Sequence, residues 1–117
     1  MRIAITLSIA LFAIAPAKSV IQIFDSPTGD IAGLGWEDGT LWALDAFTKE
    51  VFNIDPGSGN VLDSFTSTII PAGYEATGLA VENGVVYVGA WNNSTNGYIF
   101  KYDYSGTYLG GVNMCGG

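Results

Sequence analysis

The amino-acid sequence predicts an all-β fold built from a repeated unit, and three observations support this prediction. Residues 33–42, GLGWEDGTLW, return in altered form as residues 78–87, GLAVENGVVY. A period of about 45 residues is typical of repeat architectures, in which each copy is one supersecondary unit. Each copy divides into four short runs of β-branched and aromatic residues, separated by turn residues. No stretch keeps a 3.6-residue hydrophobic period with capping residues, so no helix is expected.

The first copy predicts four strands joined by tight turns. These strands are Ile31 to Glu37, Leu41 to Asp45, Val51 to Asp55 and Val61 to Thr66. Asp38-Gly39 lies between the first two and indicates a hairpin, because both central residues of a type I′ turn need positive φ. Residues 56–60, PGSGN, predict the turn before the fourth strand.

The second copy predicts the same four strands with one longer connection. The strands are Thr77 to Glu82, Val85 to Ala90, Tyr98 to Asp103 and Thr107 to Val112. Asn83-Gly84 repeats the hairpin turn of the first copy, and residues 104–106, YSG, repeat the later one. The additional residues fall at 92–97, NNSTNG, which we expect to form a polar loop.

Four antiparallel strands in about 40 to 45 residues make up one blade of a β-propeller. The chain is therefore expected to contain a two-blade segment over residues 18–117, with blade one at about 31–67 and blade two at about 77–112. Residues 20–25, VIQIFD, are similar to residues 61–65, VLDSF. We therefore expect a leading outer strand from Val20 to Asp25 ahead of the first blade.

The innermost strand of each predicted blade is rich in small residues. Gly33 and Gly35 lie on it in the first copy, and Gly78 and Ala80 in the second. Inner strands crowd together near the axis of a propeller, so small residues are expected at these positions.

The second copy resembles an NHL-type propeller repeat. The matching segments are residues 78–81 (GLAV), 83–84 (NG), 86–88 (VYV), 98–103 (YIFKYD) and 108–110 (YLG), together with Gly106. The first copy resembles related repeats of secreted bacterial propellers through residues 41–45 (LWALD) and 54–61 (IDPGSGNV). The resemblance implies a blade and not an activity, since this superfamily includes lactonases, lyases and cyclotransferases as well as binding modules.

The first seventeen residues have the features of a secretory signal peptide. Arg2 precedes an apolar run from Ile3 to Ile14, and Ala15-Pro16-Ala17 forms a small-x-small cleavage site. At about a dozen residues this run is shorter than the roughly 20 that a membrane-spanning helix needs. The sequence therefore predicts a signal peptide over residues 1–17 and a secreted or periplasmic protein.

The composition argues against several classes of partner and site. Beyond the signal peptide, Lys18, Lys49 and Lys101 are the only cations against 11 acidic residues. This acidic balance disfavours nucleic acid and anionic membrane surfaces as partners. The sequence contains no histidine and one cysteine, Cys115, so triads and zinc sites built on histidine and internal disulfides are not expected.

The longer loop of the second copy is the best candidate for ligand binding. Trp91 precedes it, and Asn92 and Asn93 open it. Loops at the ends of strands often carry binding residues, and a flat indole face is suited to a sugar. A plain surface loop remains the alternative. Trp36 and Trp42, in contrast, lie inside predicted strands and are expected to pack in the core.

Asp30 and Glu75 occupy equivalent positions just before the inner strands of the two copies. Two carboxylates converging from adjacent blades are a candidate calcium site, because Ca²⁺ prefers oxygen ligands. Solvated loop acids are the alternative. No other cofactor is expected, and the aspartates Asp45, Asp55 and Asp103 are expected to cap turns.

Three functions remain open on this sequence. The leading hypothesis is an exported, non-catalytic propeller module for binding or scaffolding, incomplete as a single chain because propellers have about four to eight blades. Its expected partners are further blades encoded by the same gene or copies of itself, with carbohydrate or protein as ligand. The alternatives are part of a lactonase- or lyase-type enzyme with a carboxylate-bound metal, and a ring-forming two-blade lectin that uses the Trp91 loop.

Overall fold

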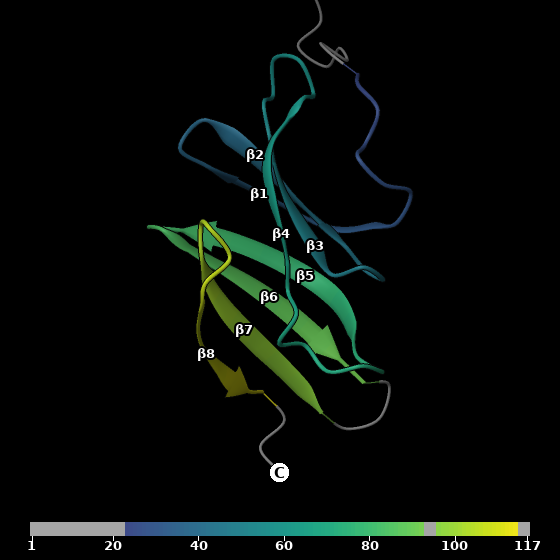
Figure 1. Cartoon of the computed structure of the whole chain (residues 1–117), viewed down its shortest axis with the longest axis vertical. Helices are drawn as coiled ribbons and strands as arrows, with labels where there is room; N and C mark the ends of the chain where they lie inside the picture. Colours follow the sequence, from purple (N-terminus) through teal and green to yellow (C-terminus); the bar gives the residue numbers. More distant parts are fainter. Residues whose placement is uncertain (1–22, 93–95, 115–117) are drawn as a thin grey trace, which may run out of the picture.

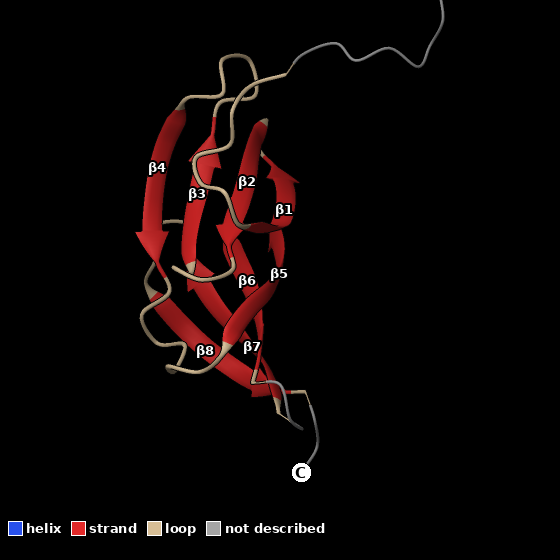
Figure 2. Ribbon diagram, turned by 90° about the vertical axis from the view of Figure 1, so that its right-hand side faces the viewer, coloured by secondary structure: helices blue, strands red, loops and turns tan. Residues whose placement is uncertain are grey.

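The computed structural model describes residues 23–92 and 96–114, which form two four-stranded antiparallel sheets stacked face to face (Figures 1 and 2). The strands of blade one are β1 (Ile31–Glu37), β2 (Thr40–Asp45), β3 (Glu50–Ile54) and β4 (Val61–Thr66). Those of blade two are β5 (Glu75–Glu82), β6 (Val85–Trp91), β7 (Gly97–Asp103) and β8 (Tyr108–Asn113). In each sheet the strands lie in sequence order. The predicted all-β fold with two four-stranded blades is therefore confirmed.

The hairpin turns have the backbone conformation that their residues predict. Asp38 and Gly39 have φ values of 52° and 74°, and Asn83 and Gly84 have φ values of 50° and 82°. Positive φ at both central positions is the type I′ requirement, which explains the acidic or amide residue followed by glycine. Each turn joins the innermost strand of a blade to the next one.

The repeat extends to the irregularities of the sheets. The first strand pair of blade one changes register between Ile31 and Gly33, and the first pair of blade two changes register between Ala76 and Gly78. The third and fourth strands of both blades also share a register change near their turn. Equivalent residues of the two copies therefore occupy equivalent places in space.

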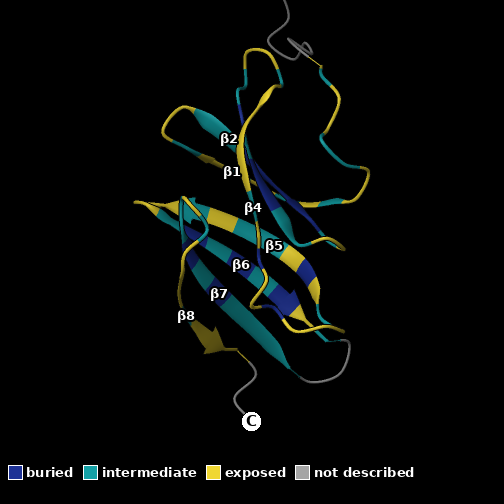
Figure 3. Cartoon of the chain, in the orientation of Figure 1, coloured by how far each residue is buried: buried dark blue, intermediate teal, exposed yellow. Residues whose placement is uncertain are grey.

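The main core lies between the two blades. From blade one it includes Trp42 and Leu44, which are 2% and 0% exposed, and from blade two Val86, Val88 and Tyr102, none more than 1% exposed. Figure 3 colours the buried segments of both sheets dark blue. Both faces of a blade are apolar because each is built to pack against another sheet.

Glycines of the inner strand of blade one allow β1 and β5 to approach closely. A Cβ atom at Gly33 would lie 2.9 Å from Cβ of Leu79, and one at Gly35 would lie 3.1 Å from Cγ2 of Val81. The expectation that inner strands crowd together is thus confirmed for blade one. On the same strand, however, Trp36 is 60% exposed. The prediction that Trp36 packs in the core is wrong for this chain, because its face of β1 points away from blade two.

The leading strand is not formed in the part that the structure describes. Residues 20–22 lie outside the described ranges, and Ile23 to Asp25 have no strand conformation. Phe24 nevertheless packs on Gly59, where a Cβ atom would lie 2.5 Å from its ring. Phe65 of β4 packs in the same way on Gly106, at 2.6 Å. The predicted strand is therefore wrong as secondary structure over 23–25, yet Phe24 fills the place of an outer-strand residue.

The expected signal peptide, residues 1–17, lies outside the described residues. Within the ranges that the structure describes, no helix is long and apolar enough to cross a membrane.

A candidate ligand pocket on the second blade

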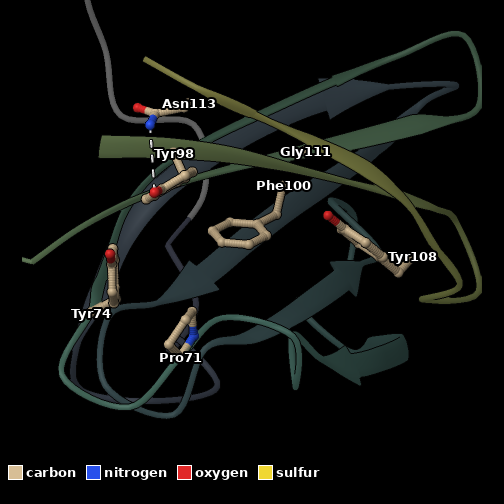
Figure 4. A pocket seen from close by; sticks show the side chains of 7 residues that line it. All are labelled: Pro71, Tyr74, Tyr98, Phe100, Tyr108, Gly111 and Asn113. Carbon is tan, nitrogen blue, oxygen red and sulfur yellow. Dashed lines mark hydrogen bonds between the residues drawn. The ribbon is translucent and has the colours of Figure 1, made fainter. Parts of the chain in front are cut away.

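A pocket of about 310 Å³ opens between β7, β8 and the segment that links the two blades. Figure 4 shows its aromatic lining. The lining residues are Pro71, Tyr74, Tyr98, Phe100, Tyr108, Gly111 and Asn113. A small, largely aromatic concavity with a few polar groups is the usual form of a small-molecule site.

The alternation of side chains along β7 brings the aromatic rings into the pocket. Tyr98 and Phe100 are two residues apart and therefore point to the same side of the sheet. On β8, Gly111 is paired with Phe100, and a Cβ atom at Gly111 would lie 2.9 Å from the Tyr108 hydroxyl. A larger residue at this position would therefore have to displace that hydroxyl.

The rings form a continuous series along the pocket wall. The centroids of Tyr74 and Tyr98 are 5.8 Å apart, those of Tyr98 and Phe100 6.0 Å, and those of Phe100 and Tyr108 6.4 Å. All three pairs are tilted, which is a favourable arrangement for aromatic rings. Each ring in the wall therefore packs against a neighbouring ring, and the wall exposes both edges and faces of these rings to the pocket.

Two asparagine amides approach the tyrosine hydroxyls. Nδ2 of Asn113 donates to the Tyr98 hydroxyl at 3.5 Å, as drawn in Figure 4, and Nδ2 of Asn92 donates to the Tyr74 hydroxyl at 3.5 Å. Nζ of Lys49 donates at 3.1 Å to the carbonyl oxygen of Pro71, which is one of the lining residues. The pocket thus combines aromatic surface with hydroxyl and amide groups, and its lining side chains carry no charge.

The aromatic lining belongs to blade two and not to the repeat. The positions of Tyr98, Tyr108 and Asn113 correspond in blade one to Glu50, Val61 and Thr66, as the strand registers show. Phe100 alone keeps its residue type, as Phe52. A blade can therefore form without these tyrosines, which points to a role beyond packing.

One described residue of the predicted binding loop contacts this pocket. Trp91 ends β6, pairs with Glu75 and Gly97, and is 42% exposed. Asn92 follows it, accepts a hydrogen bond from the Asn96 amide at 3.3 Å through Oδ1, and reaches the pocket residue Tyr74. Asn93 falls outside the described residues. Of the predicted loop residues that the structure describes, only Asn92 forms a hydrogen bond with a residue of the pocket, and the sequence analysis missed the tyrosines.

The candidate calcium ligands keep their predicted equivalence. Asp30 precedes β1, and its carbonyl oxygen accepts from Ala46 N at 3.0 Å, while Glu75 begins β5 beside Trp91. Both residues are exposed. Among residues 23–92 and 96–114, no group of three or more acidic, histidine or cysteine side chains gathers at one point. A calcium site on Asp30 and Glu75 therefore stays a candidate, with solvated loop acids as its alternative.

The aspartates at strand ends cap turns, as expected. The Asp103 carboxylate accepts from Ser105 Oγ at 2.7 Å and from Thr107 N at 2.9 Å, and these bonds lower its pKa. Asp55 accepts from Ser58 Oγ at 2.7 Å and from Gly57 N at 3.1 Å, with the same effect on its pKa. For Asp45, burial raises the pKa but hydrogen bonds outweigh it, so the pKa is lowered. These carboxylates therefore have structural partners.

Comparisons with known proteins support the fold and nothing narrower. No known protein-family profile matches the sequence, and no curated protein sequence gives a significant match. Among solved structures, the chain is similar to a europium-containing methanol dehydrogenase, with a TM-score of 0.56 and 19% identity over 69% of this chain. That protein contains a β-propeller, and the chain spans 15% of its length. The two sheets are therefore blades of the β-propeller type.

Proposed function

We propose that this protein is an exported, non-catalytic β-propeller module that binds a small neutral ligand in the pocket on blade two. The observation that carries the proposal is the series of three tyrosines and one phenylalanine along the linker, β7 and β8. Two of these tyrosines replace a glutamate and a valine of blade one, so the repeat alone does not require them.

The lining favours a carbohydrate as the ligand. Sugars present C–H faces that pack on aromatic rings, and hydroxyl groups that pair with phenol and amide groups. The Tyr108 side chain is 40% exposed and the amide of Asn113 lies at the surface, so both are accessible to a ligand from solvent. The formal net charge of −7 disfavours an anionic ligand.

The proposal is tested by NMR titration of the labelled protein with a panel of neutral mono- and oligosaccharides. We expect saturable shifts at Tyr74 and Tyr98, and their loss in the double variant Tyr108→Ser/Asn113→Ala. Val112→Ala is the matched control, because Val112 is also exposed on β8 but points to the other side of the sheet. The absence of saturable binding, or binding that the double variant leaves intact, would reject this site.

Export is a separate part of the proposal and has its own test. The support for it is the sequence of residues 1–17. When the full chain is produced in a bacterial host, we expect the protein outside the cytoplasm with Lys18 as its first residue. A cytoplasmic protein that retains Met1 or Arg2 would contradict export and leave the pocket proposal unaffected.

A further inference from the structure

Within residues 23–92 and 96–114, no segment covers the outward face of blade two. This face consists of Gly78, Ala80, Tyr87, Gly89 and Ile99, which together line a shallow groove of about 220 Å³ with Leu79, and we call it the open face. A Cβ atom at Gly78 would meet no atom within 4 Å. Gly78 and Ala80 of the inner strand β5 thus leave space for a neighbouring strand that is not present in the described chain.

The equivalent face of blade one shows which side chains pack on such a surface. Gly33, Gly35, Trp42 and Leu44 correspond to Gly78, Ala80, Tyr87 and Gly89 through the strand registers. In blade one this face is covered by blade two, with Leu79 packed on Gly33 and Val81 on Gly35. The chain therefore contains both an occupied and an unoccupied copy of the same surface.

The matching partner surface is also exposed on the same chain. Leu34 and Trp36 are the blade-one equivalents of Leu79 and Val81. They are 62% and 60% exposed, whereas Leu79 and Val81 pack against the core between the blades. Two large apolar side chains on an inner strand are thus left without the glycines that their equivalents contact.

We propose that copies of this chain associate head to tail, with Leu34 and Trp36 of one copy packed over Gly78 and Ala80 of the next. The contact repeats, between chains, the step that joins β1 to β5 within one chain. The two surfaces differ, so each copy presents the Leu34 surface on one side and the Gly78 surface on the other. Repeating the contact closes a ring when the rotation between successive copies divides a full turn evenly. For about four to eight blades, a ring contains about two to four copies.

The contact is centred on the inner strands. The outer part of the blade-one face is already covered, because Phe24 packs against the cluster of Ala43, Phe52 and Ile54. Leu34 and Leu41 line a pocket of about 340 Å³ on the same face. The free apolar side chains and the open glycines therefore meet along β1 and β5.

A second copy is the occupant that the observations favour, since both halves of the contact are present on every molecule. Neither surface needs an ion or a charged partner, because the residues that meet are leucine, tryptophan, glycine and alanine. The formal net charge of −7 opposes the contact through general repulsion. Association is therefore expected to strengthen as salt screens that repulsion.

Sedimentation velocity over a concentration series tests the proposal with two single variants. Gly78→Val fills the space that Leu34 of the next copy needs, while Gly78 has no left-handed φ and the added Cβ atom would meet no atom of the described chain within 4 Å. Leu34→Lys places a charge on the other surface. We expect the wild type to sediment at about two to four times the monomer mass and each variant as a folded monomer by circular dichroism. Thr68→Val, an exposed linker change, is the control and should behave as the wild type.

Mixing the two variants distinguishes head-to-tail contact from any symmetric one. The Gly78→Val chain keeps an intact Leu34 and the Leu34→Lys chain keeps an intact Gly78, so their mixture should form a 1:1 dimer that grows no further. A wild-type monomer at every concentration would overturn the proposal. It would also be overturned if both variants were monomeric and their mixture remained monomeric.

Discussion

Replacing Trp42 with alanine should remove a large part of the stability of the protein. Trp42 is 2% exposed, and its ring lies 5.0 Å from that of Tyr104, so it links the two blades. Burial of an aromatic side chain removes about 150 to 250 Å² from water, and at about 25 cal/mol per Å² this corresponds to about 4 to 6 kcal/mol. Its buried Nε1 has no hydrogen-bond partner among the residues that the structure describes, which offsets about 1 to 3 kcal/mol. Together with the cavity left behind, we expect a loss of about 3 to 5 kcal/mol.

Urea denaturation followed by circular dichroism measures this loss, with Trp91→Ala as the matched control. Trp91 has the same side chain at the end of β6 but is 42% exposed, so its replacement should cost about 0.5 kcal/mol. Both changes are best made in the Gly78→Val background, where association does not add to the measured stability. Equal losses of unfolding free energy at the two positions would refute the reasoning, because the larger loss expected for Trp42 rests only on its burial between the blades.

The remaining predictions concern a turn, acid stability and calcium. Gly106→Ala should be more destabilising in thermal unfolding than Gly73→Ala, because both have positive φ (92° and 87°) but only at Gly106 would the added Cβ strike Phe65, at 2.6 Å; equal shifts in Tm would contradict this packing. The pKa of Asp103 is lowered, mainly by the hydrogen bond from the Ser105 side chain. The Asp103 carboxylate therefore stabilises the folded protein above the unfolded pKa of about 3.9, and this stabilisation is lost as the pH falls through the folded pKa. Asp103→Asn should accordingly lower Tm at pH 7 and have little effect on Tm near pH 2. A Tm difference between variant and wild type that does not change with pH would contradict a stabilising role of the Asp103 carboxylate. Calorimetric titration should show no calcium binding tighter than millimolar, and tight binding that Glu75→Gln abolishes would instead favour a metal-dependent enzyme.

Local sequence features predicted most of the fold because the determinants of this architecture are local and repeated. Asp38-Gly39 and Asn83-Gly84 determine the hairpins through their φ preferences, and β1 and β4 have the predicted bounds. The exposure of Trp36 was not predictable in this way. An apolar residue on a strand indicates a face that can be buried, but whether another sheet covers that face depends on the arrangement of whole blades.

The pocket was harder to predict than the fold. Its tyrosines come from three separate segments, and their proximity depends on how the linker folds over β7 and β8. The sequence did contain one clue, because the position of Tyr98 is occupied by Glu50 in blade one. This difference between two equivalent strand positions was thus more informative than the single tryptophan of the loop.

The central claim is that the two sheets are consecutive blades whose inner strands pack directly on one another at Gly33. The most direct measurement is the nuclear Overhauser effect between the α protons of Gly33 and the β protons of Leu79 in the Gly78→Val variant. A Cβ atom at Gly33 would lie 2.9 Å from Cβ of Leu79, so the α proton in that direction is in contact with the leucine. We predict a strong cross-peak. Its absence, with both residues assigned in a folded protein, would contradict the packing on which the blade assignment and the proposed association both depend.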